Sequence, residues 1–138
     1  MEQNFNKRFI EWRDIDEAIE RLAINITNSE IGFDAVNGIP RGGLIPAIML
    51  SHKLGLPYSN FPSLKGNILL VDDICDSGKT LERYKFETHI YTVTLHYKQS
   101  ASYEPNFWWR LAPENEWIVY PWENKNSKTI QDYATKGE

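Results

Sequence analysis

Three carboxylates that lie close together, Asp72, Asp73 and Asp76, are the residues of this chain best suited to chemistry. They follow the apolar run 68–71, which we expect to be a buried parallel strand. Asp72 and Asp73 would then stand at the carboxyl end of that strand, where open α/β sheets bind their ligands. The loop 76–80 leads into a predicted helix, whose first amide groups are unpaired and suit a phosphate. This combination fits a ligand that carries a phosphate together with hydroxyl groups or a metal, such as a sugar phosphate.

Two other interpretations of the same segment deserve comparison. Residues 78–80 match the end of the phosphate-binding loop of nucleotide triphosphatases. That motif requires a further glycine where this chain has Asp73, whose charge would repel a phosphate, so we reject it. The second interpretation is a buried strand followed by an ordinary helix with Asp76 or Ser77 as its N-cap. Capping explains one of these side chains but not the two other carboxylates.

A second loop is also rich in groups that bind anions. Residues 33–39 have the pattern of a strand, and Pro40, Arg41 and Gly42 follow it before a predicted helix at 44–54. Glycine allows a close approach of the backbone, and arginine offers a planar fork of donors. The amides of this loop can therefore face an anion. Taken alone, the same residues also fit a simple turn with a solvated arginine.

Alternating helix and strand patterns predict an α/β fold, with a twisted parallel sheet flanked by helices. Residues 14–26 have the apolar spacing of an amphipathic helix, with Asp14 as the expected N-cap and Glu17 completing a capping box. Residues 44–54 form a second expected helix that ends at Gly55. The other expected elements are a helix at 77–85 and strands at 33–39, 68–71, 89–97 and 116–120.

Length and composition indicate one ordinary globular domain. The chain has 138 residues, of which 41% are hydrophobic and 25% charged. The net charge of −4 argues against a nucleic-acid-binding surface. No run approaches the ~18 apolar residues of a membrane span, and the polar start is unlike a signal peptide. The single cysteine, Cys75, excludes an internal disulfide and fits a cytoplasmic protein. We interpret it as a packing residue, because neighbouring carboxylates raise the pKa of a thiol.

In three segments the chain resembles the type I phosphoribosyltransferases. Residues 68–80 are similar to the ribose-phosphate signature of that family, in which hydrophobic residues precede two acids and an Asp-x-Gly-x-Thr loop. Residues 33–47 resemble its first strand and pyrophosphate loop, and residues 116–123 resemble the purine-binding end of the bacterial xanthine-guanine branch. The resemblance covers about residues 12–123. It implies one phosphoribosyltransferase-like domain with a core at about 10–98, a base-binding C-terminal hood at about 99–123 and a polar tail at 124–138.

The resemblance implies a glycosyltransferase, more closely a pentosyltransferase of purine salvage. Such an enzyme transfers ribose 5-phosphate from phosphoribosyl diphosphate to guanine, xanthine or hypoxanthine and releases pyrophosphate. The implied cofactor is Mg²⁺, held between the diphosphate and the ribose hydroxyls. Asp72 and Asp73 would hold these hydroxyls directly or through metal-bound water, with Asp73 as the metal residue.

The other sugar-phosphate contacts of the family fall on the two loops described above. The 5′-phosphate residues would be Asp76, Ser77, Gly78, Lys79 and Thr80. Lys79 equally suits a solvated position at the start of a helix. The pyrophosphate residues would be Pro40, Arg41 and Gly42, and the resemblance also implies a cis peptide bond between Pro40 and Arg41.

The resemblance places the purine on residues from several parts of the chain. Asp76 would be the general base at N7 of the purine, the catalytic role. Lys98 would donate to the 6-oxygen and disfavour the amino group of adenine, because an ammonium has only donors. An exposed lysine at a strand end is the alternative. Trp117 would stack on the ring. The remaining base contacts would be Ile74, Ile118 and Glu123.

One departure from the family pattern keeps a second function open. Relatives carry a long loop before the acidic strand, which closes over the site and excludes water, and here only residues 59–66 stand in its place. The alternative to an enzyme is a non-catalytic regulator that binds phosphoribosyl diphosphate or a nucleotide. Within the enzyme class, adenine or a pyrimidine is the alternative base. We expect small-molecule substrates and a homodimer or larger homo-oligomer as partners, with no nucleic acid and no membrane.

Other aromatic and imidazole side chains are expected to be structural. Residues 107–109, a run of three aromatics, would cover a sheet edge or form a subunit contact. His52, His89 and His96 have no metal-ligand spacing.

Overall fold

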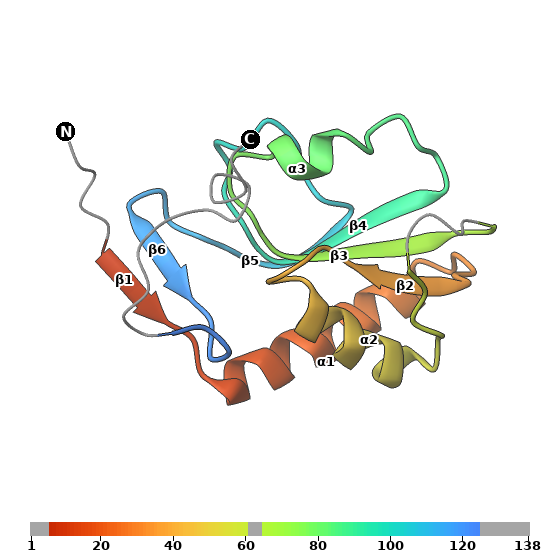
Figure 1. Ribbon diagram of the computed structural model, residues 1–138, viewed down its shortest axis with the longest axis horizontal. Helices are drawn as coiled ribbons and strands as arrows, with labels where there is room; N and C mark the ends of the chain where they lie inside the picture. The colour runs from red at the N-terminus through yellow and green to blue at the C-terminus, as the bar shows by residue number, and fades with distance from the viewer. Residues whose placement is uncertain (1–5, 61–64, 125–138) are drawn as a thin grey trace.

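The computed structural model describes residues 6–60 and 65–124. Its elements alternate between strands and helices, as expected for an α/β protein (Figure 1). In chain order they are β1 (Asn6–Phe9), α1 (Trp12–Asn28), β2 (Ala35–Gly38), α2 (Leu44–Leu54), β3 (Ile68–Cys75), α3 (Lys79–Glu82), β4 (Ile90–Tyr97), β5 (Phe107–Leu111) and β6 (Glu116–Val119). The predicted tail beyond Asn124 and residues 61–64 of the short loop lie outside the described residues.

The main sheet has four parallel strands in the order β2-β3-β4-β5. Helices α1 and α2 cover one face, and the short α3 lies on the other (Figure 1). The predicted fold class, a parallel sheet flanked by helices, is confirmed. Because all four strands run in the same direction, their carboxyl ends share one edge, and the loops after β2 and β3 are brought together there.

The larger core lies between the sheet and the two long helices. The apolar residues expected on the inner face of α1 are all buried there, each at most 7% exposed. They pack against strand residues such as Val36, Leu69 and Val93, which are fully buried. A smaller cluster around Leu70, Cys75 and Leu81 covers the opposite face. The periodicity of the sequence thus fixes which side of α1 faces the sheet.

The boundaries of the first two helices are predicted with unequal success. Helix α2 begins at Leu44 and ends at Leu54, and Gly55 adopts the left-handed conformation expected after a helix. The predicted N-cap of α1 is wrong: Glu11, not Asp14, is the N-cap. Asp14 is the third helical residue, and its carboxylate accepts a hydrogen bond from the Glu11 amide at 2.9 Å. The capping box therefore exists, but it lies one turn earlier than expected.

Two further boundaries differ from the prediction. Strand β3 does not end at Val71 but continues through both acidic residues to Cys75, because β4 pairs with its backbone up to that point. The predicted helix at 77–85 is reduced to Lys79–Glu82. After it the chain forms tight turns, such as the 2.9 Å bond from the Tyr84 amide to the Leu81 carbonyl. Leu81 is the one buried side chain of α3, so there is little apolar surface to extend the helix.

Strands β1 and β5 were not predicted. The aromatic run of β5 does not cover the sheet edge from outside, as expected, but is itself the edge strand beside β4. Strand β1 is exposed along its length and forms a separate parallel pair with β6, in which Arg8 lies opposite Ile118. Among the described residues, the helices are too short or too polar to cross a membrane.

Candidate active site

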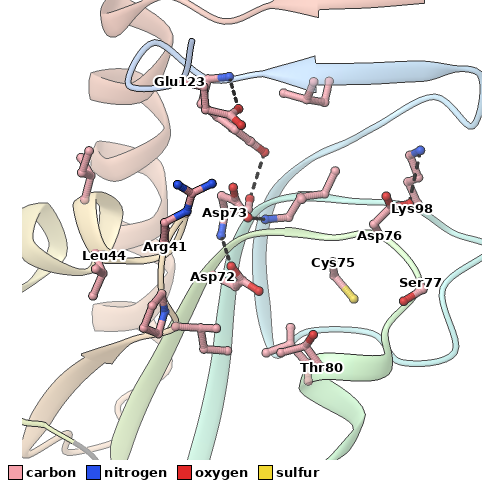
Figure 2. A pocket seen from close by; sticks show the side chains of 18 of the residues that line it. Arg41, Leu44, Asp72, Asp73, Cys75, Asp76, Ser77, Thr80, Lys98 and Glu123 are labelled. Atoms are coloured by element: carbon pink, nitrogen blue, oxygen red, sulfur yellow. Dashed lines mark hydrogen bonds and ion pairs between the residues drawn. The ribbon is translucent and has the colours of Figure 1, made fainter. Parts of the chain in front are cut away.

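A cleft of about 640 Å³ lies at the carboxyl ends of the central strands. All the site residues predicted from the sequence line it, except Lys79. Figure 2 shows Asp72 and Asp73 at its centre beside Arg41, with Asp76 and Lys98 facing each other farther along and Glu123 on the opposite wall. The volume is in the range of small-molecule sites. The topology of the sheet therefore collects residues from four separate segments into one site.

The acidic pair is held in place by the backbone of β3. The Asp73 amide donates to Asp72 Oδ1 at 2.9 Å, and the Ile74 amide donates to Asp73 Oδ1 at 2.8 Å. Both carboxyl groups are half-buried. In each acid, one carboxylate oxygen accepts a backbone hydrogen bond that fixes the orientation of the carboxylate. Both side chains still line the cleft. Such carboxylates are suited to hold hydroxyl groups or a hydrated cation.

The loop after β3, which was predicted from the sequence to bind a phosphate, is held by close packing and local hydrogen bonds. Gly78 has φ of +88°, and a Cβ there would meet Ser102 and the amide of Tyr103 at 2.8 Å. Ser102 also braces the loop, because its amide donates to the Ser77 carbonyl at 2.9 Å. Ser77 Oγ in turn accepts from the Lys79 amide at 3.3 Å. The Lys79 side chain is exposed and lies outside the lining of the cleft.

The loop after β2 packs directly against the acidic pair. The peptide bond between Pro40 and Arg41 is cis, as the sequence resemblance implied. A Cβ on Gly42 would lie 2.0 Å from Asp73 Oδ2, and one on Gly43 would lie 2.2 Å from the Val71 carbonyl oxygen. A side chain at position 43 would clash with backbone, and one at position 42 would require the Asp73 carboxylate or the loop to move. The close approach puts the backbone of this loop beside the Asp73 carboxylate.

Lys98, the residue after β4, is buried rather than exposed. Only 4% of the residue is accessible, and its ammonium lies 3.3 Å from Asp76 Oδ1. Its own amide donates to the Cys75 carbonyl at 3.0 Å, which fixes the backbone beside β3. A lysine buried to this extent with a carboxylate partner is more typical of a functional site than of a solvated strand end.

The candidate base-binding residues come from the segment that contains β6. Trp117 is half-buried and Ile118 is 6% exposed, and both line the cleft. Glu123 Oε1 accepts from the Tyr120 amide at 2.8 Å. The strand itself is held to β1 by pairing and by an ion pair between Arg8 and Glu116. That hydrogen-bonded partner lowers the pKa of the Glu116 carboxyl.

Two titratable groups of the site region behave as structural residues. Burial raises the pKa of the Cys75 thiol to about 12, and the nearby carboxylates of Asp72 and Asp76 add to the effect. Burial, assisted by Arg110 and Arg8, lowers the pKa of His96 to about 4. Both groups are therefore neutral near pH 7. Within the described residues no group of acidic, histidine and cysteine side chains could by itself hold a metal ion.

Several residues that line the cleft were missed by the sequence analysis. Among them are Leu44 and Ile45 at the start of α2, Arg83 and Tyr84 after α3, and Tyr120 and Trp122 near Glu123. Tyr120 and Trp122 were within reach, since both belong to the segment that resembles a purine-binding end. The other four have no sequence pattern that marks them as site residues, because they reach the cleft only through the placement of α2 and α3 in the fold.

No protein-family model matches the chain. A xanthine-guanine phosphoribosyltransferase from Cereibacter sphaeroides is 29% identical over 114 residues, covering 64% of this chain and 68% of that protein. The crystal structure of a purine phosphoribosyltransferase from Pyrococcus horikoshii is 29% identical, with a TM-score of 0.73 over 88% of this chain and 97% of the other.

A xanthine-guanine-hypoxanthine phosphoribosyltransferase from Helicobacter pylori is 24% identical, with a TM-score of 0.75 over 86% of this chain and 93% of the other, and supports the fold. The relatives named here are pentosyltransferases, the class of enzyme predicted from the sequence. The predicted resemblance is therefore confirmed: in sequence and fold this chain is similar to the purine phosphoribosyltransferases, including those of the xanthine-guanine branch.

Proposed function

We propose that the protein is a purine salvage enzyme of the cytoplasm. It transfers ribose 5-phosphate from phosphoribosyl diphosphate to a 6-oxopurine, namely guanine, xanthine or hypoxanthine, and releases pyrophosphate. The single observation that carries this proposal is the contact between Asp76 and Lys98 inside the cleft that also holds the acidic pair. That contact puts a proton acceptor and a donor for the base at one end of a site whose other end suits a sugar phosphate.

The sugar-phosphate half of the substrate lies along β3 and the two loops. Asp72 and Asp73 hold the ribose hydroxyls. The 5′-phosphate binds to the turn of residues 76–80, which Gly78 allows to pack closely against Ser102 and Tyr103. The diphosphate lies against Arg41 and Gly42, whose backbone is in contact with the Asp73 carboxylate.

Mg²⁺ is the proposed cofactor, and the donor set fits it in a particular way. The described residues offer no complete protein cage, but the acidic pair lies beside the diphosphate loop. Mg²⁺ is usually held by one or two carboxylates together with substrate phosphates and water. When bound, it would neutralise charge on the departing diphosphate. Asp73 is the residue expected to hold it, directly or through water.

The purine half is recognised by the pair at the other end of the cleft. O6 and N7 of an oxopurine are neighbouring atoms on one edge of the ring. The spacing of 3.3 Å between the Lys98 ammonium and the Asp76 carboxylate allows each to face one of these atoms. Lys98 donates to O6, and Asp76 accepts the proton from N7. Trp117 and Ile74 contact the faces of the ring, and Ile118 and Glu123 its far edge.

The proposed reaction replaces one bond at the anomeric carbon by another. The bond to the diphosphate oxygen breaks, and its electron pair leaves with pyrophosphate. The lone pair of purine N9 forms the new bond on the opposite face of the sugar, while the N7 proton passes to Asp76. Positive charge that develops on the ribose is stabilised by Asp72 and Asp73.

The alternative remains a regulator that binds phosphoribosyl diphosphate or a nucleotide without turnover. The short loop 59–66 favours it, because a long closing loop normally excludes water from such a reaction. The buried Lys98 argues against a sensor of phosphoribosyl diphosphate alone, since such a sensor has no need of a group directed at the base. The division into core, hood and tail and the expected homo-oligomer stay predictions.

One assay distinguishes these possibilities. The protein is incubated with phosphoribosyl diphosphate, Mg²⁺ and one base at a time, namely guanine, xanthine, hypoxanthine, adenine or uracil, and nucleotide and pyrophosphate are measured. We expect nucleotide from 6-oxopurines. Binding of phosphoribosyl diphosphate in calorimetry without nucleotide from any base would favour the regulator. Turnover of adenine alone would contradict the role given to Lys98.

A further inference from the structure

Tyr120 joins three parts of the molecule through its side chain. It follows β6, is 2% exposed, and its ring stacks on Trp122 at 5.0 Å with an interplanar angle of 3°. Its hydroxyl lies 3.0 Å from the backbone carbonyl oxygen of Asp73 in β3 and 2.8 Å from His96 Nδ1 in β4. The hydroxyl therefore bonds to the two central strands, and in β3 it does so at the second residue of the acidic pair.

The directions of these two hydrogen bonds follow from their chemistry. A backbone carbonyl can only accept, so the single hydroxyl proton of Tyr120 is donated to Asp73. His96 Nδ1 must then carry a proton and donate it to the Tyr120 oxygen. Burial raises the pKa of Tyr120 well above its usual value, with nearby carboxylates adding to the effect, so the hydroxyl keeps its proton. The result is a directed chain from His96 through Tyr120 to Asp73.

The carbonyl that receives this bond belongs to the peptide group that orients the Asp73 carboxylate. The same peptide group carries the Ile74 amide, which donates to Asp73 Oδ1 at 2.8 Å. The peptide is thus held on one side by the Tyr120 hydroxyl and on the other by the carboxylate itself. A rotation of this peptide would move Oδ1, and with it Oδ2, which lies against the Gly42 backbone.

We propose that Tyr120 is a positioning residue for the sugar-diphosphate half of the site, because its hydroxyl fixes the Asp73–Ile74 peptide and thereby the Asp73 carboxylate. The identity of the ligand, phosphoribosyl diphosphate, is taken from the proposed function. It predicts a separation of effects: loss of the hydroxyl weakens phosphoribosyl diphosphate binding and leaves purine binding unchanged. The purine side is spared because the Tyr120 backbone amide, not the hydroxyl, binds Glu123.

The test compares Tyr120→Phe with Tyr103→Phe. Tyr103 is a matched control, because its hydroxyl also makes a hydrogen bond, at 2.9 Å, but to the Thr92 hydroxyl in β4 rather than to the Asp73 carbonyl. In steady-state kinetics with guanine, Tyr120→Phe should raise the KM for phosphoribosyl diphosphate about tenfold, as expected for a buried acceptor left unpaired. The KM for guanine should change by less than about twofold, and Tyr103→Phe should leave both constants near those of the wild type.

A second readout needs no ligand. Amide hydrogen exchange of Ile74 in the free protein should be faster in Tyr120→Phe than in Tyr103→Phe, because the peptide loses its support on the carbonyl side. Equal exchange in the two variants would overturn the proposal. The proposal would also be overturned if the two variants had the same KM for phosphoribosyl diphosphate. A rise of the KM for guanine in Tyr120→Phe equal to that for phosphoribosyl diphosphate would overturn it as well. If wild-type protein fails to bind phosphoribosyl diphosphate, the proposed function fails, and the exchange measurement alone decides the role of Tyr120.

His96→Leu tests the same proposal if Tyr120→Phe does not fold. It leaves Tyr120 in place but removes the donor that orients its hydroxyl. We expect the KM for phosphoribosyl diphosphate to rise about threefold with the KM for guanine unchanged, in keeping with a weakened rather than a lost hydrogen bond. An unchanged KM for phosphoribosyl diphosphate in folded His96→Leu would contradict the chain from His96 to Asp73.

Discussion

The ammonium of Lys98 and the carboxylate of Asp76 lie 3.3 Å apart, but the two side chains are not equally buried. The side chain of Lys98 is 5% exposed and that of Asp76 is 24% exposed. If Lys98 is removed, water can therefore solvate the Asp76 carboxylate. If Asp76 is removed, water has little access to the Lys98 ammonium. A buried charge that loses its partner destabilises a protein far more than an exposed one. The pair should accordingly respond in different ways to mutation on its two sides.

Asp76→Asn is expected to affect both stability and turnover. It removes the negative charge that lies 3.3 Å from the buried Lys98 ammonium, so the free energy of unfolding should fall, by up to about 3 kcal/mol. Turnover with guanine should fall by about 10²- to 10⁴-fold, because the proposed base is lost. Calorimetry should show that phosphoribosyl diphosphate still binds. Unchanged turnover in folded protein would remove Asp76 as the general base.

Lys98→Met should be the milder change for stability. Methionine can fill the space of the lysine stem, and the carboxylate of Asp76 left behind is within reach of water. The free energy of unfolding, measured by urea denaturation, should fall less than in Asp76→Asn. The kcat/KM for hypoxanthine should drop by about 10- to 100-fold, the usual effect of losing a charged hydrogen bond. A larger loss of stability in Lys98→Met than in Asp76→Asn would contradict the inference that the more buried partner depends more on the ion pair.

Gly42→Ala tests the contact between the diphosphate loop and the acidic pair. An added Cβ would lie 2.0 Å from Asp73 Oδ2, so the loop or the carboxylate must move. We expect the dissociation constant for phosphoribosyl diphosphate to rise by more than about tenfold in calorimetry. Gly32→Ala is the matched control, since nothing lies within 4 Å of a Cβ at that position. Equal binding by the two variants would show that the loop does not need this close approach.

Acid should destabilise the protein through His96. Its pKa is lowered from 6.5 to about 4 in the folded state, chiefly by burial. Between these values the unfolded chain binds a proton that the folded chain does not, so the stability from this group is complete above pH 6.5 and is lost as the pH falls toward 4. The total loss is on the order of 3 kcal/mol. Urea denaturation of wild type and His96→Asn at pH 7 and pH 4.5 should show a smaller loss in the variant, and identical losses would exclude His96 as the cause.

Cys75 should be inert despite its place in the cleft. With a pKa of about 12 the thiol carries almost no thiolate at pH 8, and the thiolate is the reactive form. Iodoacetamide should therefore leave the native protein unlabelled at pH 8 and label it completely in guanidinium chloride, as read by mass spectrometry. Rapid labelling of the folded protein would mean that the thiol is neither buried nor protonated to this extent.

The parts of the fold that the sequence predicts well are those with a one-sided apolar pattern. The spacing of apolar residues from Ile15 to Ile26 predicts the buried face of α1, and Gly55 predicts the end of α2. Strands β3 and β4 have long apolar or β-branched runs. In each case the local sequence carries the information because burial on one side dictates the residue types.

The parts that escaped prediction depend on contacts between distant residues. Strand β1 has no buried side chain and exists because β6 pairs with it. Strand β5 is part of the sheet because β4 offers an open edge, and its aromatic run alone does not distinguish a strand from a cover. The candidate site residues in the loops after β2 and β3 line the cleft as expected, apart from Lys79, because ligand loops follow the carboxyl ends of parallel strands. The role proposed for Tyr120 was not predicted, because it depends on hydrogen bonds to β3 and β4.

The pairing of β1 with β6 has a consequence for how the site is completed and altered. The sheet strands β2, β3 and β4, with the two loops proposed to bind phosphate, form one continuous stretch of chain, Ala35 to Tyr97. The wall proposed for the base instead needs two segments from opposite sides of that stretch, joined by pairing and by Arg8 with Glu116. The wall proposed for the base is therefore complete only when the two ends of the described chain have paired. Exchanging β1 and β6 together would accordingly alter the wall proposed for the base and leave the stretch from Ala35 to Tyr97 unchanged.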